Sequence, residues 1–292
     1  MSLPPASLIV ASRDRPVLLE ALVESVLAGD EVPAEIVVVD QSRAPHPRLA
    51  DSSAPVRYVW SHSVGLSRAR NVGIATARHD LLVFTDDDLL VEPNWVGTLV
   101  RALVGAGPRA VVTGQVRPTE PETPGGFAPS TKLEQRPAVY SGRRQLGVLF
   151  PNNMALRRSA VDEVGLFDER LGVGSTYPSS EDNDLCFRLL EAGYRIVYVP
   201  EAVVYHRAWR GRGDYLPLRW RYGRGQGAYY AKHLSVRDPY ILGCLGRDAL
   251  RHAIRAARLG RRPGLATAEA AYVAGLLAGA VQWLLTERAR RT

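Results

Sequence analysis

Cysteine is scarce in this chain. Its first residues contain neither a basic segment nor a long apolar run. The two cysteines, Cys186 and Cys244, lie far apart in the 292 residues and fit neither a disulfide framework nor a zinc site. A reducing, cytoplasmic compartment is the simplest setting for such a chain. The opening residues MSLPPASLIV predict no signal peptide.

Acidic residues are nearly missing from one part of the chain. Residues 207–262 hold 13 arginines and one lysine but three acids, whereas the net charge of the whole chain is +7. The rest of the chain is therefore acidic. A basic patch of this kind can bind phosphates on nucleic acid, on anionic lipid or on a diphosphate substrate, and it can also be a solvated surface.

Short apolar runs alternate with helical patterns over the first two thirds of the chain. Helices are predicted from Pro16, from Pro93 and over Glu181–Gly193. Strands are predicted at 7–11, 35–39, 57–60, 81–84, 110–116, 153–157, 194–199 and 202–205. This alternation favours an α/β fold with an open, mostly parallel sheet flanked by helices, with 153–157 at its edge.

The pattern changes after His206. Three helices are expected near 214–234, 240–259 and 265–288, so we divide the chain into a body, 1–206, and a basic helical extension, 207–292. The last helix is about long enough to span a bilayer. Glu269, Gln282 and many small residues favour a helix that packs on protein or lies at a membrane surface. Its apolar face would also suit a homodimer.

Three consecutive carboxylates, Asp86, Asp87 and Asp88, follow the apolar run at 81–84. Like charges this close repel one another, and a divalent cation would remove the repulsion. Carboxylates with water and phosphate oxygens suit Mg²⁺ or Mn²⁺. An acidic turn after a strand is the alternative. Ser12, Arg13 and Asp40 also follow predicted strands, and ligands of open α/β sheets bind at those ends.

The order of these signals resembles the inverting nucleotide-sugar glycosyltransferases of family 2, which have the GT-A fold. The resemblance covers about residues 6–206 and not 207–292. It is carried by seven segments at matching spacings, LIVASRDRP, EIVVVDQS, GLSRARNVGIA, VFTDDD, NNMALRRSAVDEVGLFDERLGVG, SEDNDLCFRLLEAG and VPEAVVYH. It implies a GT-A nucleotide-sugar-binding and catalytic domain over 1–206.

The resemblance also implies residue roles on the donor side. It places the nucleotide against a set of strand-end residues, Ala11, Ser12, Arg13, Asp40, Arg70, Asp86 and Asp87. A carboxylate at Asp40 would accept a hydrogen bond from a uracil or thymine imide, which favours a UDP- or dTDP-linked donor. Arg70 would lie near the diphosphate or support the aspartates. Asp86 or Asp88, together with His206, would hold Mn²⁺ or Mg²⁺.

On the acceptor side, Asp182 resembles the catalytic base, and Glu181 and Asn153 would contact the acceptor. An inverting transfer is a single displacement, which needs one carboxylate to take the acceptor's proton. Capping of a helix is the alternative role for Glu181 and Asp182. The Arg-Trp pair at 219–220 resembles an element of processive synthases, but Leu216 stands where those have glutamine, so we expect transfer of a single sugar.

Several other functions remain as alternatives. The first is transfer to a lipid-linked or polyprenyl-phosphate acceptor by an enzyme at the inner face of the membrane, with 207–292 touching anionic lipid. Saccharide and small-molecule acceptors are equally open. A nucleotidylyltransferase would favour a glycine-rich loop where SRDRP stands. A nucleic-acid module would use the aromatic and basic residues after 207, but the acidic constellation argues against it, and we expect no nucleic-acid partner.

Overall fold

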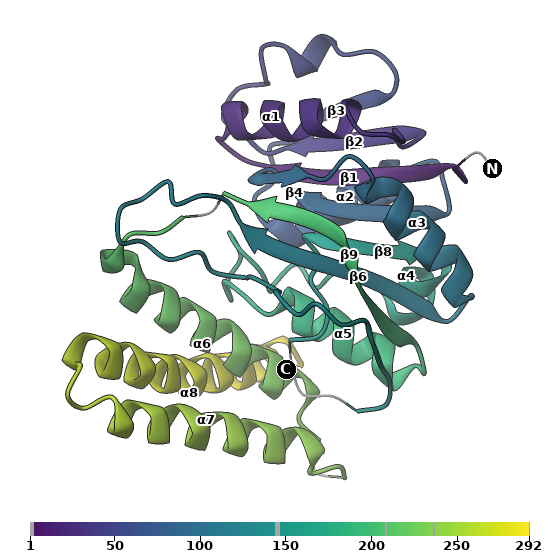
Figure 1. Cartoon of the computed structure of the whole chain (residues 1–292). Coiled ribbons are helices and arrows are strands. Elements are labelled where there is room, and N and C mark those ends of the chain that lie inside the picture. The colour runs from purple at the N-terminus through teal and green to yellow at the C-terminus, as the bar shows by residue number, and fades with distance from the viewer. Residues whose placement is uncertain (1–2, 144–146, 208, 236, 292) are drawn as a thin grey trace.

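The computed structural model describes residues 3–143, 147–207, 209–235 and 237–291. Within these ranges nine strands form one sheet with helices on both faces (Figure 1). The strands are β1 (Ala6–Ser12), β2 (Glu35–Asp40), β3 (Val56–Trp60), β4 (Leu81–Asp86), β5 (Leu89–Val91), β6 (Ala110–Pro118), β7 (Ala138–Tyr140), β8 (Asn153–Arg157) and β9 (Arg195–His206).

The parallel half of the sheet brings the predicted strand ends together. Its order is β3-β2-β1-β4, and every neighbouring pair is parallel. The β2 run EIVVVD is buried throughout, as expected for a parallel strand covered on both faces. In the register Ser12 lies beside Asp40 and Ala11 beside Asp86, so all three strands end at one edge.

The other half of the sheet mixes strand directions. β8 is antiparallel to both β4 and β6 and lies between them, so the prediction of an edge strand at 153–157 is wrong. β9 is parallel to β6 but antiparallel to β5 and β7. β9 is one continuous strand, although the sequence predicts two, at 194–199 and 202–205. A shift in register beside Gly114 and Gln115 accommodates residues 200–202.

The first five helices cover the two faces of the sheet, and the last three form a layer of their own. They are α1 (Pro16–Leu27), α2 (Leu66–Thr76), α3 (Trp95–Ala106), α4 (Arg158–Val164), α5 (Glu181–Glu191), α6 (Tyr215–His233), α7 (Tyr240–Arg258) and α8 (Pro263–Arg291), with 3-10 turns at Leu49–Asp51 and Arg212–Asp214. Side chains alternate along β1: Leu8 and Val10 pack with α1 and α3, whereas Ile9 packs with α2, α4 and α5. This alternation follows from the two-residue period of a strand.

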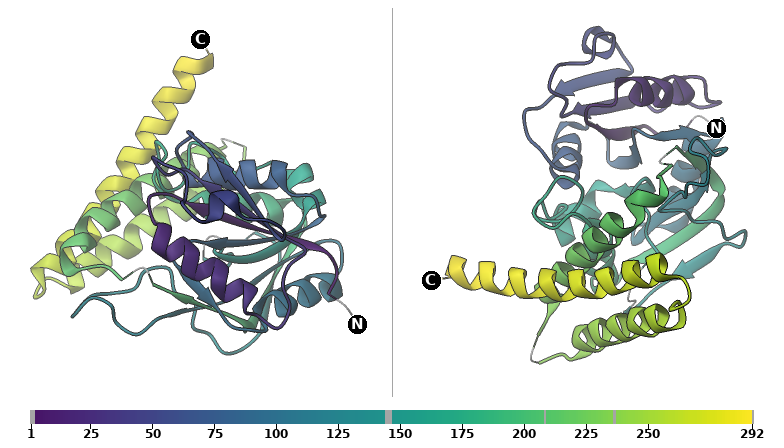
Figure 2. Two further views of the ribbon diagram at one scale, coloured as in Figure 1. Left: turned by 90° about the horizontal axis from the view of Figure 1, so that it is seen from above. Right: turned by 90° about the vertical axis from the view of Figure 1, so that its left-hand side faces the viewer.

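Helices α6, α7 and α8 form a layer beside α5 (Figures 1 and 2). Phe187 of α5 shares a buried cluster with Tyr229 of α6 and Tyr272 of α8. Helices α6 and α8 approach closely because glycines face the partner backbone. A Cβ at Gly227 would overlap the carbonyl oxygen of Leu276, and one at Gly279 would overlap that of Arg224.

One stretch of α8, Pro263–Thr286, is long and apolar enough to cross a membrane by length and composition. In its most apolar window, 39% of the residues are buried inside the protein. A core helix of a soluble protein passes the same test, and α8 packs along α6 and α7.

Candidate active site

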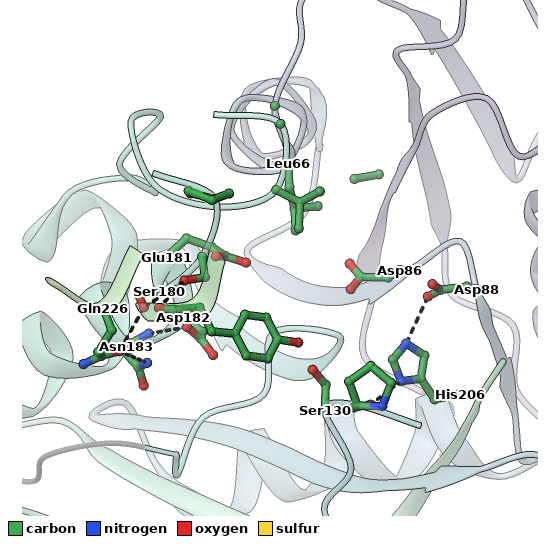
Figure 3. A pocket seen from close by; sticks show the side chains of 18 of the residues that line it. Leu66, Asp86, Asp88, Ser130, Ser180, Glu181, Asp182, Asn183, His206 and Gln226 are labelled. Atoms are coloured by element: carbon green, nitrogen blue, oxygen red, sulfur yellow. Dashed lines mark hydrogen bonds and ion pairs between the residues drawn. The ribbon is translucent and has the colours of Figure 1, made fainter. Parts of the chain in front are cut away.

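A cleft of about 610 Å³ opens at the ends of the parallel strands and continues along the helical layer. Ala11, Ser12 and Arg13 line it from β1 and the residue after it. Figure 3 shows Glu181 and Asp182 on one side of the cleft and Asp86, Asp88 and His206 on the other. Segments far apart in the sequence therefore meet at one site.

The aspartate cluster is held by neighbouring side chains. Asp87 accepts hydrogen bonds from Ser12 Oγ at 2.8 Å and from Arg15 at 3.0 Å. Arg15 also donates to Asp88 at 2.8 Å. Burial and the charge of Asp88 raise the pKa of the Asp87 carboxyl to about 6. Asp87 thus resists ionisation, as a buried carboxyl beside a like charge does, and Arg15 is shared between Asp87 and Asp88.

Asp88 and His206 form the part of the cluster that suits a metal. Asp88 Oδ1 lies 3.4 Å from His206 Nε2, and Nδ1 of the same ring lies 3.1 Å from the carbonyl oxygen of Pro129. Burial opposes a charged ring, but Asp88 outweighs it and raises the pKa of His206. With the ring neutral and Nδ1 donating, the lone pair of Nε2 would be available to a cation. Burial opposes a charged Asp88, but His206 and Arg15 outweigh it and lower the pKa of this carboxyl.

Across the described part of the chain, no three carboxylate, histidine or cysteine side chains gather into a ready metal site. The pair of Asp88 and His206 instead fits an ion that completes its shell with water and phosphate oxygens, as Mg²⁺ commonly does beside diphosphates.

Arg70 of α2 joins the two sides of the cleft from beneath. Its guanidinium donates to Asp86 at 2.8 Å and to Glu181 at 3.3 Å, and its side chain is 3% exposed. Arg70 does not line the cleft. Of its two predicted roles, the structure gives it the support of the aspartates and not a position against the diphosphate.

Asp182 lies in the first turn of α5, after a strained residue. Ser180 precedes the helix with φ of 72°, a left-handed conformation that is uncommon for serine and that recurs at functional sites. Asp182 accepts a hydrogen bond from the N–H of Asn183 at 2.7 Å. Burial and the charge of Glu181 raise the pKa of the Asp182 carboxyl to about 7. A carboxyl with this pKa is suited to proton transfer at neutral pH.

Besides Arg70, two further predicted site residues lie outside the cleft. Asn153 is fully buried, and it accepts from Trp95 Nε1 and donates to the carbonyls of Gln115 and Ala202. All its hydrogen-bonding groups hold β6, β8, β9 and α3 together, so the predicted acceptor contact does not fit its position. This is a correction: the asparagine of the NNMALRR segment belongs to the core.

Asp40 is the second such residue. It is 2% exposed, and its carboxylate accepts from Tyr58 at 2.6 Å and from the N–H of Ser42 at 2.9 Å. These partners hold the carboxylate between β2 and β3, and Asp40 is not among the residues that line the cleft. Its contact with the base stays a prediction. Its neighbour Gln41 does line the cleft.

Models of two protein families match this chain. The model of glycosyl transferase family 2 matches residues 7–165, and that of glycosyl transferase family group 2 matches residues 138–286. The chain belongs to glycosyl transferase family 2.

Family 2 relatives with assigned activities are moderately similar to the chain. The pre-mycofactocin glycosyltransferase of Mycobacterium tuberculosis is 30% identical over 185 residues, which cover 62% of this chain and 38% of that protein. The glucosyl-dolichyl phosphate glucuronosyltransferase of Haloferax volcanii is 28% identical over 205 residues, which cover 66% and 65%. The chain thus spans well under half the length of the mycobacterial relative.

Solved structures confirm the GT-A fold. The mannosyltransferase PcManGT from Pyrobaculum calidifontis, in complex with GDP-Man and Mn²⁺, aligns over 96% of this chain and 88% of its own, with a TM-score of 0.62 and 18% identity. At this identity the likeness establishes the fold alone. The alignment extends beyond residue 206 and so includes part of the helical layer.

Sequence reasoning missed several residues of the cleft in this family 2 enzyme. Arg15 stands inside the SRDRP segment, but nothing in the sequence says that it reaches two aspartates. The cleft is also lined by Arg210, which precedes α6, and by Arg219, Tyr222 and Gln226 of α6. We call this side of the cleft, together with the cleft residues of α7 and α8, the helical wall. It lies beyond the segments that carry the family resemblance. The excess of arginines after residue 207 was the one available signal for this wall.

Proposed function

We propose that the chain moves a single sugar from a nucleoside-diphosphate donor to an acceptor hydroxyl, with inversion at the anomeric carbon. One observation carries this proposal: Asp182 lines the same cleft as Asp86, Asp87 and Asp88. Figure 3 shows Asp182 across the cleft from Asp86 and Asp88. Residues 1–206 would hold the donor and the base, and residues 207–292 would complete the acceptor side. A UDP- or dTDP-linked sugar remains the favoured donor.

Asp182 would take the proton of the acceptor hydroxyl as that oxygen attacks the sugar. The displacement is a single step, so no second, nucleophilic carboxylate is required. Burial favours the neutral form of the Asp182 carboxyl and raises its pKa to about 7. The carboxylate is therefore a strong enough base to take up a proton near neutral pH. Glu181, fixed by Arg70 at 3.3 Å, would orient the acceptor.

On the donor side, Ala11, Ser12 and Arg13 would contact the nucleotide at the end of β1. Asp88 and His206 would hold a divalent cation, Mn²⁺ or Mg²⁺, and Asp86 is poised beside them. Such an ion, when bound, neutralises charge on the departing nucleoside diphosphate. The donor and Mn²⁺ bound by the Pyrobaculum mannosyltransferase support this choice of cofactor.

Thermal shift against a panel of nucleotide sugars, with and without Mn²⁺, tests the proposal. A ligand at a hundred times its Kd stabilises the folded state by about 2.7 kcal/mol. We expect one nucleotide sugar to raise Tm by several degrees with Mn²⁺ and much less with EDTA. In His206→Ala the Mn²⁺-dependent part should shrink. Stabilisation by a nucleotide sugar that is equal with Mn²⁺ and with EDTA would contradict the metal role.

A lipid-linked acceptor at a membrane surface is a second candidate, favoured by α7. Leu242, Leu250 and Ile254 of this helix are exposed at 55%, 60% and 42% and recur at helical spacing. Arginines flank them, among them Arg247, Arg251, Arg255 and Arg258. Apolar and basic side chains on one surface helix are typical of helices that lie on anionic membranes. The Haloferax relative is named for a glucosyl-dolichyl phosphate, which is a lipid-linked compound.

Sedimentation with vesicles tests this candidate on the full chain. Wild type should bind vesicles that contain phosphatidylglycerol and should bind neutral phosphatidylcholine weakly. Leu250→Asp should reduce binding, whereas Val17→Asp, at a 74% exposed position of α1, should not. Equal sedimentation with both vesicle types, or an equal effect of the two substitutions, would reject the membrane role of α7.

A further inference from the structure

Among the residues that the structure describes, several buried N–H donors on the helical wall of the cleft have no hydrogen-bond partner. They are Arg210 Nε, Arg219 Nε and Gln226 Nε2, and all three residues line the cleft. Gln226 is 3% exposed. A buried donor without a partner destabilises a protein by roughly 1–3 kcal/mol, so three on one wall call for an explanation.

These donors share one surface of the cleft. Arg219, Tyr222 and Gln226 are three and four residues apart on α6, and this spacing puts them on one face of the helix. Tyr222 and Arg210 line the same cleft as Asp182 and Glu181. The wall therefore reaches the place where an acceptor hydroxyl would meet Asp182.

The network around Gln226 fixes which of its atoms is free. Its Oε1 accepts from Ser180 Oγ at 2.9 Å and from Asn183 Nδ2 at 3.1 Å. The carbonyl end of the amide is thus satisfied by the two residues that flank Glu181 and Asp182, and the Nε2 end is left as a donor. The free atom calls for an acceptor-rich partner.

Charge divides the cleft into two halves. The sheet side and α5 contribute five carboxylates, Asp86, Asp87, Asp88, Glu181 and Asp182, against Arg13 and Arg15. The helical wall contributes Arg210, Arg219 and Arg251 against Asp248. Of these, Arg219 is paired with buried Glu269 at 3.1 Å, whereas no carboxylate of the described residues lies within ion-pair distance of Arg210 or Arg251. The first half suits a cation, and the second suits an anion.

We propose that the helical wall binds a phosphate or similar oxyanion carried by the acceptor, and that Arg210, Arg219 and Gln226 are its specificity-determining residues. This inference rests on the proposed function, because it assigns the acceptor to the same cleft. An oxyanion can accept from donors of this kind, and charge-assisted hydrogen bonds are the strong ones. A prenyl phosphate and a phosphorylated soluble acceptor both present this group.

Binding measured by calorimetry tests the inference with farnesyl phosphate, farnesol and inorganic phosphate as probes. Arg210→Gln removes the charge. Gln226→Glu keeps an oxygen for Ser180 and Asn183 but replaces the free donor with a charge that repels the anion. Arg221→Gln is the matched control, because this arginine lies on α6, is exposed and does not line the cleft. Thermal melts show that each variant is folded.

Wild type should bind farnesyl phosphate and not farnesol, and both cleft variants should weaken binding roughly tenfold to a hundredfold, with UDP binding unchanged. Arg221→Gln should bind as wild type does. Inorganic phosphate that competes with farnesyl phosphate would point to recognition of the phosphate alone, and failure to compete would point to the lipid-linked source.

Equal binding of farnesyl phosphate and farnesol, or wild-type affinity in folded Arg210→Gln and Gln226→Glu, would overturn the inference. Failure of every nucleotide sugar to bind, with farnesyl phosphate binding retained, would instead overturn the proposed function and leave this site standing.

Discussion

Arg70 donates a 2.8 Å hydrogen bond to Asp86 from a side chain that is 3% exposed. Its other nitrogen reaches Glu181, so one buried cation holds carboxylates from both sides of the cleft. We expect Arg70→Met to lower the free energy of unfolding by about 3–5 kcal/mol, because two carboxylates lose their partner. Arg70→Lys should restore only part of it, since an ammonium cannot reproduce the fork. Chemical denaturation measures both.

The matched control for Arg70 is its neighbour Arg68. Arg68 lies on the same helix as Arg70 and pairs with Glu169 at 2.8 Å. Both of these side chains are more than 40% exposed. Arg68→Met should therefore change stability by less than about 1 kcal/mol. Similar losses in the two variants would show that the pairing beneath the cleft has no special weight.

The pH dependence of activity should follow Asp182. Its pKa is raised to about 7, and a base must be deprotonated, so kcat should fall about tenfold for each pH unit below 7. The measurement is a rate profile from pH 5 to 9 at saturating donor. A rate that stays constant down to pH 5 would show that no group with this pKa acts as the base.

Stability should depend on pH in the opposite sense. A carboxyl whose folded pKa lies above its unfolded value stabilises the fold when protonated, and this contribution is lost as pH rises through about 7. Asp182→Asn removes the titrating group. The variant should therefore become more stable than wild type as pH rises from 5 to about 7, by roughly 1.4 kcal/mol for each pH unit, and the difference should level off above that pH. Thermal melts of both proteins at each pH report this difference as a shift in Tm. A constant difference across this range would refute the raised pKa.

Asn153 should behave as a core residue. Asn153→Leu strands Trp95 Nε1 and two carbonyls inside the sheet, and we expect a loss of about 2–5 kcal/mol in unfolding free energy. Exposed Asn94, which makes no cap hydrogen bond, should tolerate alanine within about 0.5 kcal/mol. An Asn153→Leu variant with normal stability but a raised KM for the acceptor would restore the contact predicted from sequence.

The parts of the site that sequence could predict are those set by strand ends. Ser12 and Asp86 to Asp88 follow apolar runs, and parallel strands must end at one edge, so their convergence follows from the pattern. Which carboxylates face the cleft does not follow. Asp40 turns to Tyr58, and Asn153 turns inward to Trp95, because tertiary partners decide the direction of a polar side chain.

The helical wall was beyond prediction for a different reason. Its position depends on how α6 packs on α5 and α8, through contacts such as those of Gly227 and Phe187, and helical periodicity reports only that each helix has a buried face. The sequence shows that this region is rich in arginine. It does not reveal that Arg210 and Arg219 line the same cleft as Asp182. β8 shows the same limit, since an apolar run does not reveal its neighbours in a sheet.

The most direct test of the central claim is the rate of sugar transfer by Asp182→Asn with donor binding measured in the same preparation. Asparagine can keep the hydrogen bond from the N–H of Asn183, so the variant should fold and bind the nucleotide sugar with wild-type affinity. The account predicts a fall in kcat of roughly a hundredfold or more, since an amide cannot take the acceptor's proton. Transfer at the wild-type rate by this folded, donor-binding variant would contradict it.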